Sequence, residues 1–443
     1  MERIIEKNLN AWKLLERRKP LLVRGARQVG KTFSVRKFGK VLFNSFVEVD
    51  LERNRNWHKI FESDSNPQRI ISELEVVTGQ KIIPGETLLF FDEIQSCPKA
   101  IMALRYFYEE LPRIHVVAAG SLLEFALEHL SFPVGRVQFL EMHPMNFVEY
   151  LWAIDKKMLA DIVCRKPQKV SDPIHHMLME ELRNYFFIGG MPETVEVYLK
   201  TKSIYECFGV HKELCETFRQ DFAKYAPRSN SACLDAVFSS LSRSVGKQIK
   251  YSQLSRDFSH PTIKNAFDLF CKARIIKKVS STVPGLPLGA KASARKFKAI
   301  MVDIGLWRYL SGMRLDVEFQ ERDLLSIYDG EMAEQFVGQE LMVSQQSELY
   351  YWSRDSRGSS AEVDYLIADD NAVFPIEVKS GSSGRMRSLH MLLEQYPECR
   401  KGVIFSSASY AELPDQRLLF LPLYYAGGKF PQETKGGTKL ASF

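Results

Sequence analysis

The sequence between residues 25 and 32 has the composition and spacing of a loop that binds phosphate. It is Gly25-Ala26-Arg27-Gln28-Val29-Gly30-Lys31-Thr32, the pattern G-x-x-x-x-G-K-T. Glycines let backbone N–H groups approach phosphate oxygens, and a helix that starts at the loop adds positive potential. The Lys31 ammonium is expected to reach the β- and γ-phosphates, and the Thr32 hydroxyl to ligate Mg²⁺. We therefore assign residues 25–32, with Phe33 after them, to the binding of ATP and Mg²⁺.

Two acids follow a continuous apolar segment at Leu88–Phe91. Ligands of open α/β sheets bind at the carboxyl ends of the strands, so Asp92 is expected to hold the Mg²⁺ ion. Glu93 is then placed to polarise the attacking water. A solvated helix cap is the alternative for two acids after a strand, and the loop at Gly25 disfavours it. Together the two motifs predict hydrolysis of ATP.

Two further residues are weaker catalytic candidates. Ser121 follows a predicted strand that ends at Gly120, where a polar side chain could sense the γ-phosphate. Arg136 could act as an arginine finger on a neighbouring copy in a homo-oligomer. A serine that caps a helix and an arginine on a solvated loop are the alternatives.

A second group of charged residues lies near the C-terminus. Asp364 and Glu377 stand on two successive apolar segments, and Lys379 faces the same side as Glu377 because strand residues two apart do so. If the strands pair as a hairpin, the two carboxylates form an oxygen site suited to Mg²⁺, with Glu334 as a third acid. The layout resembles the PD-(D/E)xK nucleases, with Val363 in place of the proline. Two alternatives remain. One is an inactive nuclease fold that binds nucleic acid without cutting it, and the other is that these residues are ordinary surface charge.

The elements that must position these residues alternate between apolar strands and helices up to about residue 150. The predicted strands are Leu21–Val23, Phe46–Val49, Leu88–Phe91 and His115–Ala119. Nearly continuous apolar runs are typical of parallel strands that are buried on both faces. After residue 325 the pattern predicts an αβββαβ order, with helices at 330–343 and 386–393 and strands at 349–352, 363–367, 373–378 and 402–405. We divide the chain into an ATPase core (1–150), a helical lid (151–230), a winged-helix-like domain (231–324), a nuclease-like domain (325–425) and a disordered tail (426–443).

The winged-helix prediction depends on two helical segments, 252–258 and 262–270, a loop with Pro and Gly at 283–289, and a strand at 299–302. Basic residues recur around them, and such a cluster would neutralise DNA phosphates. The basic residues are Lys247, Lys250, Arg256, Lys264, Lys272, Arg274, Lys277, Lys278, Lys291, Arg295, Lys296 and Lys298. A solvated face and a protein-interaction module are the alternatives.

The overall composition permits these functions without selecting one. The 443 residues include 60 basic and 54 acidic side chains, for a formal charge of +6, which permits contact with nucleic acid without requiring it. The seven cysteines have no C-x-x-C spacing and indicate free thiols in a reducing compartment. The N-terminal segment lacks the apolar core of a signal peptide, and no long apolar run occurs, so we expect a cytoplasmic protein that does not contact membranes.

Taken together, these motifs resemble those of a large prokaryotic family of AAA+-type ATP-binding proteins with a C-terminal domain similar to Holliday-junction resolvases. The resemblance spans nearly the whole chain. Beyond the motifs already named it includes Asp92–Gln95, Gly120–Leu123, Pro133–Arg136, Gly189–Glu193, Lys298–Leu306 and Ile376–Ser380. It implies an α/β fold: a P-loop parallel sheet core, a helical lid, a winged helix and a restriction-endonuclease-like C-terminal domain.

The sequence thus predicts an ATPase that requires Mg²⁺ and whose nucleotide state controls how the C-terminal domains engage a partner, which we expect to be DNA. Two other functions stay open. One is a metal-dependent DNA nuclease gated by ATP. The other is a non-enzymatic signalling or defence scaffold whose nuclease fold is inert.

Overall fold

The chain forms two compact units, each assembled from separate stretches of sequence. The computed structural model describes residues 1–127, 135–225, 229–312, 330–344, 348–356, 359–369, 372–379 and 386–428. The first unit combines Met1–Ile154, Asn184–Lys278 and Arg295–Glu321. The second combines Asp155–Arg183, Val279–Ala294 and Arg322–Phe443. The predicted domain boundaries treat each domain as one continuous stretch, and they stay predictions.

The N-terminal part of the first unit contains a parallel sheet, as predicted, and this sheet has five strands. Its order is β2-β3-β4-β1-β5, so β1 and β3 lie on either side of β4. The strands are β1 (Leu21–Arg24), β2 (Ser45–Asp50), β3 (Thr87–Asp92), β4 (His115–Gly120) and β5 (Gln138–Glu141). Every residue of β3 and β4 is buried, which agrees with the apolar runs in the sequence. The exposed edge strand β5 has no such run, and the sequence analysis did not find it.

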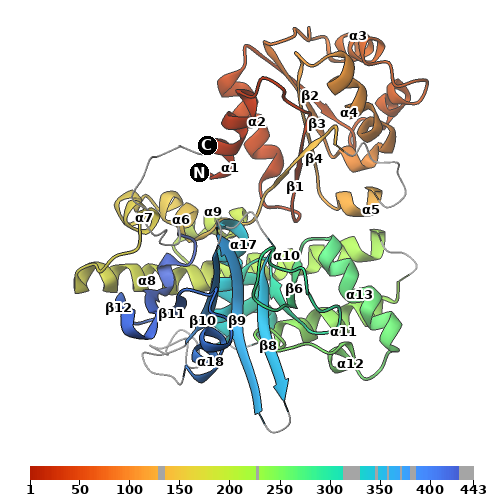
Figure 1. Cartoon of the computed structure of the whole chain (residues 1–443). Coiled ribbons are helices and arrows are strands. Elements are labelled where there is room, and N and C mark those ends of the chain that lie inside the picture. Colours follow the sequence, from red (N-terminus) through yellow and green to blue (C-terminus); the bar gives the residue numbers. More distant parts are fainter. Residues whose placement is uncertain are drawn as a thin grey trace. The chain divides into compact units, whose positions relative to one another are not determined.

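Helices cover both faces of this sheet (Figure 1). On one side lie α1 (Ile5–Lys13) and α2 (Lys31–Leu42), and on the other lie α3 (Pro67–Thr78) and α4 (Pro98–Glu110). The short elements η1 (Arg55–Phe61), η2 (Ile94–Ser96) and α5 (Leu123–Leu127) complete this part. A core cluster joins side chains of β2, β3 and β4 to those of α3 and α4. The packing holds the carboxyl ends of the parallel strands, and the loops after them, at one edge.

The rest of the first unit is mostly helical and ends in a helix-strand segment. Its elements are α6 (Phe147–Ala153), α9 (Pro192–Thr201), α10 (Ile204–Tyr225), α11 (Ser231–Ser242), α12 (Tyr251–Leu254), α13 (His260–Lys272), β7 (Phe297–Met301) and α14 (Ile304–Ser311). The helix expected at 252–258 is a single turn, α12. Strand β6 (Ile276–Ser281) begins here, where it pairs with β7, and its last residues belong to the second unit.

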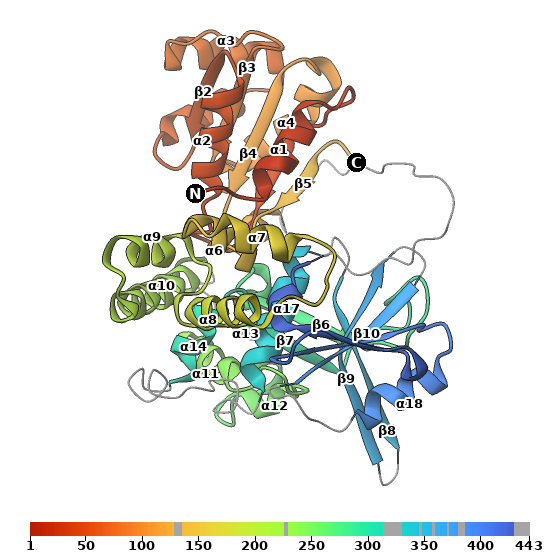
Figure 2. The same cartoon turned by 90° about the vertical axis from the view of Figure 1, so that its left-hand side faces the viewer.

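The second unit is a mixed sheet with helices packed on it (Figure 2). Strand order is β12-β13-β11-β10-β9-β8, and β8 pairs with the end of β6. The elements are α7 (Lys157–Cys164), α8 (Asp172–Ile188, which continues into the first unit), α17 (Glu331–Ser344), β8 (Tyr350–Ser356), β9 (Ser359–Asp369), β10 (Ala372–Val378), α18 (Arg387–Gln395), β11 (Gly402–Ser406), β12 (Ala411–Leu413), η3 (Pro414–Gln416), β13 (Leu418–Pro422) and η4 (Leu423–Tyr425). The predicted αβββαβ order is present from α17 to β11, and β12 and β13 follow it.

Several sequence-based expectations have a direct structural outcome. Lys298, which we counted in the basic surface cluster, is 1% exposed, because β7 is buried along its whole length.

The seven cysteines are free thiols. Within the described ranges, no helix is both long enough and apolar enough to span a membrane. Residues 426–428 of the predicted tail are described, and Ala426 is buried. The rest of the tail, together with Pro133, Val134 and Ser380, lies outside the described residues.

Candidate nucleotide-binding site

The glycine-rich loop leaves β1 at Arg24 and enters α2 at Lys31, as the sequence predicts. Gln28 and Gly30 have φ angles of 64° and 95°, so the loop turns through the left-handed region. A Cβ on Gly25 would lie 2.0 Å from the carbonyl oxygen of Met142. Only glycine fits at this position, because the chain of residues 141–142 runs directly against the loop.

The side chain of Lys31 is buried and turned onto the loop. Its Nζ donates hydrogen bonds to the carbonyl oxygens of Gly25, at 3.1 Å, and Ala26, at 2.7 Å. Burial lowers the pKa of this ammonium to about 8, although the nearby carboxylates of Glu93 and Asp92 oppose the shift. A cation with a depressed pKa is poorly solvated, and an anion brought beside it would be bound strongly.

The loop meets the end of β3 through a direct hydrogen bond. The Thr32 hydroxyl donates to Asp92 Oδ1 at 3.0 Å. Burial, followed by the nearby charge of Glu93, raises the pKa of Asp92 to about 6. The structure thus brings together the hydroxyl and the carboxylate that we predicted as Mg²⁺ ligands. Two hard oxygen donors at one point fit such an ion.

Glu93 is held beside this pair by a residue for which the sequence analysis had no role. Its backbone is left-handed, with φ 47°, and its carboxylate accepts a 2.5 Å hydrogen bond from the Gln95 side-chain amide. A Cβ on Gly120 would lie 2.3 Å from the Gln95 oxygen, so the glycine at the end of β4 makes room for this amide. The motif Asp92–Gln95 therefore works as one unit, in which Gln95 orients Glu93.

The two weaker candidates have different surroundings. Ser121 is 3% exposed and follows β4. Because β4 lies between β1 and β3, Ser121 stands at the same sheet edge as the loop and Asp92. Arg136 lies 3.1 Å from Glu109 of α4, is 46% exposed, and is not among the described residues that line the cavity next to the loop. Its role on a neighbouring copy stays a prediction.

A cavity of about 860 Å³ opens over the loop, and we call it the loop cavity. Lys31, Thr32, Phe33, Glu93 and Ser121 line it, so the structure gathers these predicted residues around one space. Other segments supply lining residues that the sequence analysis missed. These are Met1, Arg3, Arg36, Met145, Pro192, Glu193 and Glu196, together with Ser34 near the start of α2. The predicted loop residues Arg27, Gln28 and Gly30 also line the cavity.

Arg3 fixes the loop from the N-terminal side. Its guanidinium donates to the carbonyl oxygens of Val29, at 3.0 Å, and His143, at 2.6 Å, and pairs with Glu149 at 3.0 Å. Glu149 also accepts a hydrogen bond from the N–H of Ile4 at 2.6 Å. The arginine is 7% exposed, so these are buried, charge-assisted bonds. Nothing in the spacing of the sequence links residue 3 to residue 29.

The start of α9, which follows the turn Gly189–Gly190, also lines the loop cavity. A Cβ on Gly190 would lie 1.9 Å from the Met145 carbonyl oxygen, and Gly189 has φ 71°. The N–H of Gly190 donates to the buried carboxylate of Asp303 at 2.6 Å. Asp303 also caps α14. Two segments of the family resemblance, 189–193 and 298–306, therefore meet through one hydrogen bond.

The C-terminal charged residues are partly brought together. Tyr365 of β9 pairs with Ile376 of β10, and this antiparallel register places Asp364 next to Glu377. The Asp364 carboxylate accepts from the Val378 N–H at 2.8 Å, and Lys379 Nζ donates to Glu377 at 2.5 Å. Over the described part of the chain, however, no group of three or more acidic, histidine or cysteine side chains is placed to hold a metal ion. The three-acid site with Glu334 is therefore not assembled in this structure, and its function stays a prediction.

Comparison with protein families identifies the class of the domain that carries the loop cavity. Residues 17–151 match a family described as AAA domain. Residues 179–316 match Domain of unknown function (DUF8612), and residues 329–425 match Domain of unknown function (DUF4143). None of the curated proteins matches the chain.

Some solved structures are similar at low scores. Caenorhabditis elegans PCH-2 is 15% identical over 46% of this chain and 64% of that chain, with a TM-score of 0.27. The ORC1 protein of Aeropyrum pernix in complex with DNA is 12% identical over 71% and 92%, with a TM-score of 0.27. Drosophila ORC bound to DNA is 12% identical over 71% and 95%, with a TM-score of 0.26. We draw no conclusion from likenesses at these scores.

The family match and the geometry agree on residues 17–151. A parallel sheet, a glycine-rich loop between β1 and α2, and a carboxylate at the end of β3 define a P-loop domain of the AAA class. This confirms the predicted class of the core. The winged-helix and nuclease-like predictions are not confirmed, since the families that match those parts have no assigned function.

Proposed function

We propose that this chain binds ATP with Mg²⁺ in the loop cavity and hydrolyses it, and that its nucleotide state controls how the C-terminal segments engage DNA. The observation that carries hydrolysis is the 3.0 Å hydrogen bond between Thr32 and Asp92, with Glu93 immediately beside it. A site that only held the nucleotide would need the loop alone. A carboxylate beside the proposed Mg²⁺ ligands is suited to activate water.

The residues present fit a magnesium nucleotide. Thr32 and Asp92 supply hard oxygen donors, and Lys31 supplies a buried cation that donates to the loop carbonyls of Gly25 and Ala26. When bound, Mg²⁺ would neutralise charge on the phosphate oxygens. Lys31 would then donate to those oxygens in place of the carbonyls of Gly25 and Ala26.

Glu93 is the base in this proposal. Its carboxylate would accept a hydrogen bond from water and take the proton, while the Gln95 amide fixes its orientation through the 2.5 Å contact. Ser121 would donate to the terminal phosphate from the neighbouring strand end. Arg136 would serve a second copy of the chain, if the protein assembles into an oligomer.

The test is steady-state ATP hydrolysis by the purified chain with Mg²⁺. We expect Lys31→Ala to lose binding and turnover together, and Glu93→Gln to keep binding while turnover falls by about 10²-fold or more. Glu52→Gln, which changes an acid outside the loop cavity, is the matched control and should behave as wild type. Equal turnover in the wild type, Lys31→Ala and Glu93→Gln would refute the proposal.

The DNA part rests on a weaker observation, the arrangement of α11, α12 and α13 before β6 and β7. Helix α13 packs on α11 and α12, and Ile249 bridges Phe297 of β7, a layout typical of winged helices. Lys264 is exposed on α13, as a phosphate contact requires. ATP turnover measured with and without single-stranded, duplex and branched DNA tests this part, and stimulation by none of them would contradict it.

A metal-dependent nuclease is the second candidate, because the register of β9 and β10 places Asp364 beside Glu377 and Lys379 contacts Glu377. It predicts cleavage of DNA that requires Mg²⁺ and disappears in Asp364→Ala and Lys379→Ala. ATP-driven assembly without cleavage of any DNA form would instead favour a scaffold with an inert nuclease fold.

A further inference from the structure

Arg274 stands where the helix-strand segment of the first unit meets the strand ends beside the phosphate loop. It follows the last helical turn of α13 and has φ 58°, a left-handed conformation that residues other than glycine rarely adopt. Such residues persist where surrounding contacts hold them, and they gather at functional sites. The contacts that hold Arg274 are two carboxylates of the AAA domain.

These carboxylates belong to elements that leave the same sheet edge. Arg274 Nε and Nη2 donate to Glu124 Oε1 at 2.9 and 2.6 Å, and Nη1 pairs with Glu141. Glu124 lies three residues after Ser121, in α5, and Glu141 is the last residue of β5. One guanidinium therefore bridges the segment after β4 and the end of β5.

Arg24 completes the cluster from the loop side. It is the last residue of β1, is paired in register with Glu141, and directly precedes Gly25. Its guanidinium lies 3.7 Å from Glu124 and 3.9 Å from Glu141. Burial and the nearby charge of Arg274 lower the pKa of Arg24, and the charge of Glu124 opposes the shift. All four side chains are between one fifth and two fifths exposed, so solvent screens the cluster only in part.

We propose that Arg274 is a positioning residue for ATP turnover: through Glu124 and Glu141 it fixes Ser121 and the start of the phosphate loop, and thereby couples the α13–β6 segment to the loop cavity. The proposal rests on the proposed function. Arg274 itself does not line the cavity among the described residues, so its effect passes through the two acids. Movement of the segment after α13 would shift the Ser121 side of the cavity relative to Lys31.

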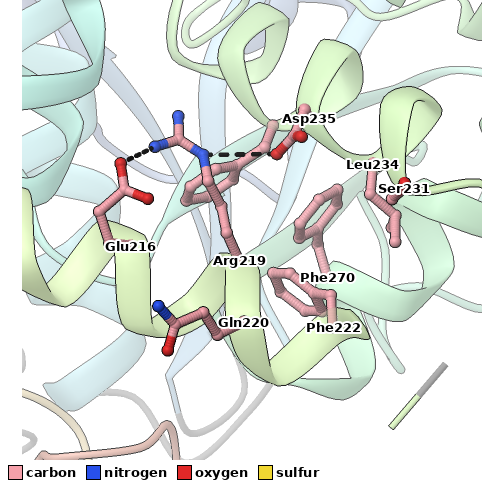
Figure 3. Close-up of a pocket in the computed structure, with 9 residues that line it drawn as sticks. Glu216, Arg219, Gln220, Phe222, Ser231, Leu234, Asp235 and Phe270 are labelled. Atoms are coloured by element: carbon pink, nitrogen blue, oxygen red, sulfur yellow. Dashed lines mark hydrogen bonds and ion pairs between the residues drawn. The ribbon is translucent and has the colours of Figure 1, made fainter. Parts of the chain in front are cut away.

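Arg219 offers a matched control. It too lies between two acids, Glu216 at 2.9 Å and Asp235 at 3.4 Å, and its side chain is partly exposed (Figure 3). Both of its partners, however, belong to α10 and α11 rather than to the AAA domain. The rings of Phe222, Phe238 and Phe270 line the surrounding pocket, and among the described residues this pocket and the loop cavity share none.

The experiment compares kcat and KM for ATP in Arg274→Gln and Arg219→Gln. We expect Arg274→Gln to lower kcat by about fivefold or more while KM changes by less than about twofold, and Arg274→Lys to recover part of the rate. Arg219→Gln should keep both constants within about twofold of wild type. Because Arg274 acts through Glu124, the double variant with Glu124→Gln should lose no more than the stronger single variant.

The outcomes distinguish the positioning role of Arg274 from the proposed hydrolysis of ATP. A wild-type rate in Arg274→Gln, or equal losses in Arg274→Gln and Arg219→Gln, overturns the positioning role while ATP hydrolysis stands. A wild-type protein without turnover overturns both. If Arg274→Gln does not fold, Glu124→Gln applies the same test, because it removes the carboxylate charge that accepts from Arg274 Nε and Nη2.

Discussion

Raising the pH should weaken the binding of a non-hydrolysable ATP analogue, because the Lys31 ammonium loses its proton unusually early. Burial places its pKa at about 8, against 10.5 for a solvated lysine. Phosphates beside the ammonium would restore a pKa near that ordinary value or above it. When binding raises the pKa of a group, the ligand binds with full affinity below the pKa that the group has in the ligand-free protein. The affinity for the ligand then falls as the pH rises through that value. Binding above pH 8 is therefore coupled to the uptake of one proton.

The size of the effect follows from the shift. Affinity falls about tenfold per pH unit above about 8, so a change from pH 7 to pH 9.5 costs roughly 30-fold, or about 2 kcal/mol. On the acid side Asp92, with its pKa raised to about 6, must lose a proton to hold Mg²⁺. The Mg²⁺-dependent part of the affinity should therefore fall about tenfold per unit below pH 6. The two groups together define a window between about pH 6 and pH 8.

Isothermal titration calorimetry measures this window directly. Titrations in two buffers of different ionisation enthalpy report the number of protons taken up at pH 9, which should approach one. Lys31→Arg keeps its charge throughout and should show no alkaline fall, whatever its absolute affinity. Asp92→Asn should show no acid fall in the Mg²⁺-dependent part. A flat affinity of the wild type between pH 7 and 9.5 would refute the reasoning about Lys31.

Two further predictions concern the stability of the ligand-free protein. The pKa of Asp92 is higher in the folded than in the unfolded chain, so its ionisation at pH 7 opposes folding. Asp92→Asn should therefore raise the free energy of unfolding by about 1 to 3 kcal/mol, and it should abolish turnover. A lower midpoint of unfolding in urea for this variant would contradict the prediction. Gly190→Ala should lower that free energy by about 3 kcal/mol or more, since its Cβ would meet the Met145 carbonyl oxygen at 1.9 Å. Gly209→Ala is the control, because Gly209 lies in a helix and nothing lies within 4 Å of the new Cβ. This variant should be neutral or stabilising by up to about 1 kcal/mol. Equal losses of unfolding free energy in the two variants would contradict the steric argument.

Much of the AAA core was predictable because its information is local. The apolar runs of β1 to β4 specify buried parallel strands, and the loop and Asp92 occupy fixed positions relative to them. Strand β5 was not predictable in this way, since Gln138–Glu141 lies at the sheet edge with mostly exposed side chains and has no apolar run. Its position depends on pairing with β1, which is a tertiary property.

The other side of the candidate site was out of reach for the same reason. Arg3 and Pro192 line the loop cavity from segments far from the loop in sequence, and no spacing rule connects them. Lys298 was misassigned to a basic surface because charge alone does not reveal that a strand is buried on both faces. Gln95 could have been suspected from its place two residues after Glu93, although only the structure shows that its amide reaches the carboxylate.

The interleaving of the two compact units has a consequence for how the chain is made. Residues Asp155–Arg183 belong with a unit whose main part begins at Arg322, about 140 residues later. At ribosomal rates of 5–20 residues per second, roughly 7 to 28 s pass between the synthesis of this segment and the start of that main part. During this time contacts between α8 and the end of the chain, such as the 3.1 Å hydrogen bond between His175 Nδ1 and the Tyr424 hydroxyl, cannot yet form. A fragment that ends near residue 321 would contain Asp155–Arg183 without the main part of its unit, and we expect it to aggregate.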